Sequence, residues 1–367
     1  MPYNNTTKGP APNHGPSSPT TRLPLYLALA YTALIIYASL HPFSGWRDPG
    51  LSPFYFLTTT WPRYWTVFDL TINIFAYLPL GFLVTLILPP FSARWKRWIS
   101  ALIAAMFGAL LSFSLESLQT GLPSRVASNL DFASNTLGAC TGALLALWKG
   151  HRFFDRIVLM QHHLLTPIHS AEPGMILIGL WLLTQLSPET ILFGAGDLRQ
   201  LLEIPPVVPY AAHSFFAIET GVIVCNSVAI GLITRTLLAG KIRSYAALVF
   251  FFVLALSIRT LAAAILINPY SAFTWLTPGA GLGLMFGGAL LSLMLLLPAS
   301  LRIALAGLAL MAGTVLVNIT PPNPYSAAAL ATWRQGHFLN FNGLTRLVAS
   351  LWPFLALPYL IVLGRRL

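Results

Sequence analysis

The sequence predicts an all-α membrane protein, a polytopic bundle of about ten transmembrane helices with both ends of the chain in the cytoplasm. Of its 367 residues, 56% are hydrophobic and 8% are charged, whereas a soluble domain carries about 25% charged residues. Apolar runs of the roughly 20 residues that a membrane helix needs recur from Leu23 to Leu363. Basic clusters alternate with sparsely charged loops between these runs, which is typical of cytoplasmic and external loops.

The chain begins with residues 1–22, which are rich in Pro, Asn, Ser and Thr and predict a disordered cytoplasmic tail. The loop of residues 41–67 is rich in aromatic residues, which favours a segment lying along the membrane interface. The apolar runs predict helices at residues 23–40, 68–88, 98–118, 130–148, 175–193, 211–233, 245–267, 279–297, 303–317 and 344–363.

The basic loops set the orientation. With the amino terminus inside, the loops after spans two, four, six and eight are inside together with Arg365 and Arg366. One of these connections, residues 151–172, separates a four-helix membrane domain (residues 23–150) from a six-span region (residues 173–367). The net charge of +11 is explained by this topology, so we expect no nucleic-acid partner. No cofactor motif is present, and His162 with His163 lacks the further ligands that a metal site needs.

Three neighbouring helices each carry an acid and an amide three or four residues apart, a spacing that places both on one helix face. We call these residues and the Arg between the last two helices the acid–amide cluster. Its members are Asp69, Asn73, Glu116, Gln119, Arg125, Asp131 and Asn135. The predicted topology brings all of them to the outer membrane face. Because a charge deep in a span costs about 2.5–3.5 kcal/mol, such residues usually pair or serve a function.

Two interpretations of this cluster stay open. In the structural one, Asp131 caps its helix or acts as a first-turn anion, and Glu116 pairs with Arg125 to close the hairpin. In the functional one, the side chains face a common pocket, and two carboxylates within reach of each other carry out general acid–base chemistry.

The second half of the chain carries a candidate intramembrane charge pair. Glu219 lies in predicted span six and Arg259 in span seven, and we expect Arg259 to neutralise Glu219. Such a pair either fixes the fold or forms part of a polar path. His337, Asn340 and Asn342 lie at the outer start of the last span, where they are expected to cover the outer pocket.

The polar motifs resemble those of the VanZ-like membrane family. The first motif combines Asp69 and Asn73 with the stretch LPLGF at residues 78–82. The second runs from Glu116 and Gln119 through Arg125 and Asp131 to the glycines at 138 and 142. The resemblance covers about residues 25–150. The segment GHFLNFNGLT further along resembles a carboxyl-terminal extension of longer bacterial homologues.

The resemblance implies a multi-pass protein of the bacterial plasma membrane with a role in the cell envelope, in a family named for antibiotic resistance to teicoplanin. The expected partner of the outer pocket is a membrane lipid, a lipid-linked envelope precursor or a lipoglycopeptide. An enzyme would use Glu116 or Asp131 as a base, with Arg125 on a phosphate. A transporter would use Glu219 and Arg259 as its coupling site, and a scaffold would depend on no single pocket residue.

Overall fold

A computed structural model describes residues 22–365 with gaps. The gaps are residues 42, 63, 89–93, 151, 155, 158, 160–170, 200–201, 203, 205–209, 240–243, 268 and 322–338. The predicted tail before Arg22, most of the connection 151–172 with both of its central histidines, and His337 lie outside the described residues. The side chains of Asn340 and Asn342 lie outside them too.

The elements of this described part are helical throughout. Those of the first half are α1 (Leu23–Leu40), η1 (Tyr55–Leu57), α2 (Val67–Ile87), α3 (Arg94–Gln119), α4 (Asn129–Leu145) and the π-helical turn η2 (Ala146–Gly150). Those of the second half are α6 (Ala171–Thr184), α7 (Ala212–Leu237), α8 (Ser244–Leu266), η3 (Pro269–Ser271), α9 (Pro278–Met294), α10 (Ala299–Ile319) and α12 (Leu339–Gly364).

The all-α prediction is confirmed. Within the described ranges, seven helices are long and apolar enough to cross a membrane, and α6 and α9 are shorter apolar helices. The helix α4 is continued by η2 without a break. The count of ten spans and the cytoplasmic position of both chain ends stay predictions.

The predicted fifth span, residues 175–193, differs from the structure. The helix α6 ends at Thr184, and the chain then continues without helical structure past Gly196. Phe193 and Gly196 have positive φ angles of 59° and 89°, which a helix does not allow. Leu192 and Phe193 are nevertheless fully buried. The apolar character of this stretch therefore reports burial in the protein core and not a membrane helix.

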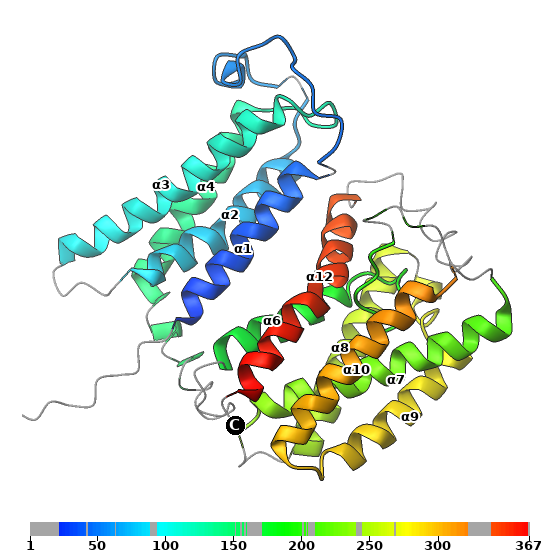
Figure 1. Cartoon of the computed structure of the whole chain (residues 1–367). Helices are drawn as coiled ribbons and strands as arrows, with labels where there is room; N and C mark the ends of the chain where they lie inside the picture. The colour runs from blue at the N-terminus through cyan, green and yellow to red at the C-terminus, as the bar shows by residue number, and fades with distance from the viewer. Residues whose placement is uncertain are drawn as a thin grey trace, which may run out of the picture.

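Figure 1 shows the helices as two groups, with α1 to α4 in one and α6 to α12 in the other. The groups meet where α1 contacts α6 and α12. At one end of this junction the backbone N–H of Arg22 donates to Glu172 at 3.0 Å. At the other end the ring of His41 packs directly against Gly343 of α12.

The first group is built on backbone-to-backbone packing of α2 against α4, which run parallel. A methyl group at Gly81 would overlap the carbonyl of Ala139, and methyl groups at Gly138 and Gly142 would overlap the carbonyls of Ile74 and Leu78. Small residues let membrane helices approach this closely and gain dispersion and Cα–H···O contacts. These glycines therefore set the separation of α2 and α4.

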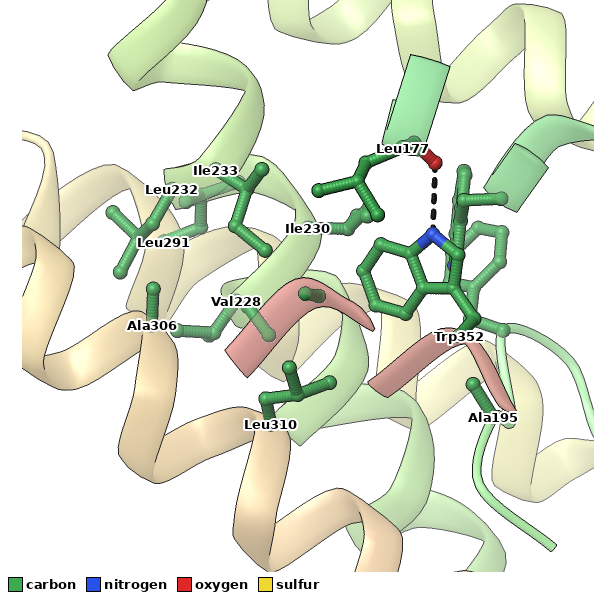
Figure 2. Packing of buried hydrophobic residues seen from close by; sticks show 14 of the residues in the cluster. Leu177, Ala195, Val228, Ile230, Leu232, Ile233, Leu291, Ala306, Leu310 and Trp352 are labelled. Atoms are coloured by element: carbon green, nitrogen blue, oxygen red, sulfur yellow. Dashed lines mark hydrogen bonds between the residues drawn. The ribbon is translucent and has the colours of Figure 1, made fainter. Parts of the chain in front are cut away.

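The second group surrounds a larger apolar core, of which Figure 2 shows a part. Trp352 of α12 is 1% exposed, and its indole N–H donates to the carbonyl of Leu177 in α6 at 2.8 Å. Pro353 has no N–H, so the carbonyl of Ala349 lacks its helical donor. The N–H of Gly196 supplies that bond at 2.8 Å. The irregular segment after α6 is thus fastened to α12 at the proline.

We expect Gly142→Ala to destabilise the protein, because the added methyl group forces α2 and α4 apart. Overpacking of this kind costs about 1–3 kcal/mol. Thermal unfolding of the purified protein in detergent measures the effect. Gly179→Ala is the matched control, because a methyl group there meets no atom within 4 Å. Equal melting midpoints for the two variants would contradict the proposed role of Gly142.

Candidate functional site

The amino-terminal turn of α2 is fixed by a reciprocal cap. The Thr66 hydroxyl accepts the N–H of Asp69 at 3.1 Å, and the Asp69 carboxylate accepts the N–H of Thr66 at 3.2 Å and its hydroxyl at 2.7 Å. This capping box satisfies two donors that would otherwise be free at the helix start. Asp69 therefore has a structural role, although its side chain remains exposed at the surface of the cluster.

Asp131 links α4 to α2. Ser128 is the N-cap of α4, and its hydroxyl accepts the N–H groups of Leu130 and Asp131. Because Ser128 caps the helix, the Asp131 carboxylate is not needed as the cap. It accepts a hydrogen bond from the Asn73 amide of α2 at 2.8 Å. Asp131 is a first-turn anion of α4, as the structural interpretation expected, and it is also the direct contact between two of the predicted acid–amide pairs.

Glu116 is the buried end of the cluster. It is 4% exposed, and one carboxylate oxygen accepts the backbone N–H of Ser128 at 2.8 Å. The Asp131 carboxylate is close enough to repel Glu116 on one side and Asp69 on the other. The three carboxylates thus form a continuous acidic track from the exposed Asp69 to the buried Glu116.

Arg125 does not form the expected ion pair with Glu116 in the part of the chain that the structure describes. Its guanidinium donates to the carbonyl of Ala38 at 2.7 Å and twice to that of His41, at 3.1 and 3.3 Å. Gln119 likewise donates to the carbonyl of Ser39 at 3.0 Å. Because the last carbonyls of a helix lack donors and carry partial negative charge, both side chains fasten the end of α1. Burial lowers the pKa of Arg125, and the charge of Glu116 opposes that shift.

Asn135 lies deeper between the helices and apart from the carboxylates. It is 7% exposed, and its amide donates to the hydroxyl of Ser112 in α3 at 3.0 Å. Its carbonyl oxygen is buried without a partner in the described structure. The amide therefore joins α3 to α4 and is not part of the acidic track.

An aromatic loop lies beside the acidic track. Phe54 stacks on Phe113 of α3 with 5.4 Å between ring centroids, and the Asn129 amide of α4 donates to the carbonyl of Thr59 at 2.8 Å. From this anchored loop Tyr64 projects outward and is 94% exposed. A loop of this kind suits the membrane–water boundary, where aromatic rings bind amphiphilic molecules.

The family model described as VanZ/LLP1 matches residues 24–150, the part of the chain that holds the whole acid–amide cluster. These residues are a VanZ-like domain. The resemblance inferred from the polar motifs is thereby confirmed. Comparison with curated proteins and with solved structures gives no match. The apolar helices and the VanZ-like domain together indicate a membrane protein.

Outside the VanZ-like domain, the Arg259 guanidinium is surrounded by backbone carbonyl groups. It is 1% exposed and donates to the carbonyls of Ser187 at 2.6 Å and Pro188 at 3.1 Å, and also to the carbonyl and hydroxyl of Thr190. The carboxylate of Glu189 lies near the guanidinium. Arg259 thus holds the irregular segment that follows α6.

Glu219 does not meet Arg259, so the expected pair is not formed. Its carboxylate accepts the hydroxyl of Thr277 at 2.8 Å, and Thr277 is the N-cap of α9. Helical spacing predicts which way Arg259 faces but not which acid it meets. The irregular segment after α6 brings Glu189 near Arg259, in the place where Glu219 was expected. Glu189 is an acid inside a predicted apolar span, a signal that would have identified it.

Further polar residues that the sequence did not single out lie near the junction with the VanZ-like domain. Arg346 of α12 binds Glu189 at 2.9 Å, and Thr345 meets the hydroxyl of Ser187. Gly343, two residues before Thr345, touches His41, whose Nδ1 lies 2.7 Å from the Tyr37 hydroxyl. The end of α1 is therefore held by Arg125 on one side and packed against α12 on the other.

Replacing Arg125 should weaken the attachment of α1. We expect Arg125→Gln to lower the free energy of unfolding by about 2 kcal/mol, because the charged hydrogen bonds to α1 are lost. Arg125→Lys should restore part of this, since lysine lacks the planar fork. Thermal unfolding in detergent tests both variants. Arg47→Gln, in the exposed loop, is the control. If the lysine and glutamine variants match the parent, the bonds to α1 contribute nothing.

The stability of the protein should depend on pH through His41. Burial and the nearby Arg125 charge hold the pKa of His41 below its usual value of about 6.5. When pH falls below about 6.5 the unfolded chain takes up a proton that folded His41 resists, so stability present above this pH is lost as pH falls. We expect the contribution of His41, measured as the difference in melting midpoint between the parent and His41→Gln, to become less favourable as pH falls from about pH 7 to pH 5. Identical slopes in the two proteins would exclude this role of His41.

Proposed function

We propose that this protein is a multi-pass protein of the bacterial plasma membrane whose VanZ-like domain binds an amphiphile of the cell envelope at the acid–amide cluster. The amphiphile is a lipid, a lipid-linked precursor or a lipoglycopeptide, which would give a role like that of teicoplanin resistance. The observation that carries the proposal is the Asn73–Asp131 contact, which joins two helix starts where an exposed and a half-buried carboxylate lie together.

The chemistry of the cluster favours ligands that bring hydrogen-bond donors. Asp69, Asp131 and Glu116 offer acceptor oxygens, and their mutual repulsion is relieved by a cation or a donor group. Arg125, by contrast, already donates to the carbonyls of α1. This supports an amine-, amide- or hydroxyl-bearing head group and removes the support for a phosphate bound by Arg125.

The neighbouring aromatic loop supports an amphiphile over a small water-soluble ligand. Trp61 and Tyr64 are exposed on the loop, and Phe68 is exposed at the start of α2 beside Asp69. A ligand with its polar group at the carboxylates can therefore place an apolar tail against aromatic side chains. Aromatic residues at a membrane boundary commonly hold molecules that are apolar at one end and polar at the other.

An enzyme acting on a lipid-linked envelope substrate is the second candidate. It is favoured by the closeness of Asp131 to Glu116, because carboxylates that repel each other can hold and release a proton. The transporter interpretation loses the Glu219–Arg259 pair on which it was based, since each residue has other partners.

We expect native mass spectrometry of the protein in lipid nanodiscs to detect an amphiphile retained from a bacterial total lipid extract, or added teicoplanin. Retention should fall about tenfold in Asp131→Asn, which is the loss of about 1.4 kcal/mol of binding free energy. Glu116→Gln should weaken retention as well. Asp48→Asn is the matched control, because Asp48 is an exposed acid of the aromatic loop whose carboxylate accepts the N–H of Gly50.

The mass of the retained molecule after incubation separates binding from catalysis. An unchanged mass supports a binding role, and a changed mass that depends on Glu116 supports the enzyme. Equal retention by the parent, Asp131→Asn and Asp48→Asn would overturn the proposal and leave the cluster as a set of helix caps and cross-links.

A further inference from the structure

A long groove crosses the second group of helices, far along the chain from the VanZ-like domain. Its volume is about 240 Å³, its floor is α7, and its walls are α8 and α9. The lining includes Ser227, Leu248, Phe252, Leu284, Gly288 and Leu291. At one end the Tyr245 hydroxyl donates to the carbonyl of Ser292 at 3.3 Å and bridges the two walls.

The shape and chemistry of the groove fit a hydrocarbon chain. Its lining runs on α8 from Tyr245 to Leu256, a helical rise of about 16 Å. The 240 Å³ are therefore spread over a long and narrow space. Val253 and Val249 at its rim are exposed, so the groove is open on the surface of the helix bundle. An apolar space of this kind gains dispersion contacts only when an apolar group fills it.

One polar atom in the groove has no partner. Ser227 is 3% exposed, and its hydroxyl is buried without a hydrogen bond in the described structure. Its neighbour in the groove, Leu291, packs against Gly231, one helical turn further along α7. The next turn of α7 carries Arg235. The groove therefore leads toward a cation at the end of α7.

Two arginines lie at that end. Arg235 of α7 and Arg302 of α10 are close enough to repel each other, and neither belongs to an ion pair of the described residues. The Nε of Arg302 is buried without a partner in the same part of the chain. Because α9 ends and α8 begins at this end of the bundle, the arginines lie near the Tyr245 end of the groove. Basic pockets between membrane helices attract anionic lipid head groups.

We propose that the α8–α9 groove holds one acyl chain of an anionic phospholipid whose phosphate lies beside Arg235 and Arg302. The apolar walls recognise the chain, and the two guanidinium groups, which form no ion pair within the described residues, recognise the phosphate. This site is separate from the acid–amide cluster, which offers acceptors to donor groups and not cations to a phosphate. The lipid would bind to the second group of helices as a structural component of it.

The test is lipid retention by the full-length protein, measured by native mass spectrometry after reconstitution with equal amounts of phosphatidylglycerol and phosphatidylcholine. We expect one retained phosphatidylglycerol per parent chain. Gly288→Leu fills the groove from α9 and should lower retention about tenfold. Gly281→Leu is the matched control on the same helix. A Cβ atom added at either position meets no atom within 4 Å, so the backbone accepts a side chain at both and we expect both variants to fold like the parent.

Two further variants make the result decisive. Val253→Trp fills the groove from the α8 side and should reproduce the loss, which guards against a folding defect specific to Gly288. The double variant Arg235→Gln with Arg302→Gln should abolish the preference for phosphatidylglycerol over phosphatidylcholine. Retention by Gly288→Leu and Val253→Trp equal to that of Gly281→Leu would overturn the proposal, and an unchanged lipid preference in the double variant would overturn the phosphate site. These variants leave Asp69 and Asp131 intact, so the outcome is independent of binding at the VanZ-like domain.

Discussion

The close approach of α2 and α4 is the constraint on which the VanZ-like domain depends. Three glycines let each helix place its backbone against the carbonyls of the other. Because the helices run parallel, their amino-terminal ends lie together, and each end carries an aspartate. The Asn73–Asp131 bond of 2.8 Å spans a separation that larger residues at these positions would increase. The packing therefore comes first, and the polar cluster is its consequence.

The polar residues of the acid–amide cluster hold helix ends in place, and its carboxylates still carry lone pairs that a ligand can reach. Asp69 caps α2, Gln119 and Arg125 hold the end of α1, and Glu116 accepts a backbone N–H at the start of α4. Each bond satisfies a group that membrane or protein interior would otherwise leave unpaired. In the described part of the domain the carboxylates of the cluster nevertheless outnumber its one cation, Arg125, and the proposed binding of an amphiphile rests on this acidic end beside exposed aromatic rings.

The two groups of helices are connected through the end of α1. His41 lies between Arg125 of the VanZ-like domain and Gly343 of α12, and Arg346 one turn later binds Glu189. Glu189 in turn lies near Arg259. A chain of packed and charged groups thus leads from the acid–amide cluster into the second group, which gives the extra helices a physical connection to the family domain.

The sequence alone determined the helical class, the membrane character, the positions of the helices other than α6 to within about five residues, and the family of residues 24–150. These follow from composition and from helical spacing, which are local properties of the chain. It also predicted that Asp69, Asn73 and Asp131 gather at one end of the bundle, because their helices start there.

Tertiary structure alone decided which partners the polar residues take. Arg125 binds carbonyls and not Glu116, Arg259 lies near Glu189 and not Glu219, and residues 185–193 are buried or half-buried without being helical. The reason is that hydrophobicity indicates which residues are buried, and helical spacing indicates which residues share one face of a helix. The neighbour that a side chain meets depends on how segments distant in the sequence pack together.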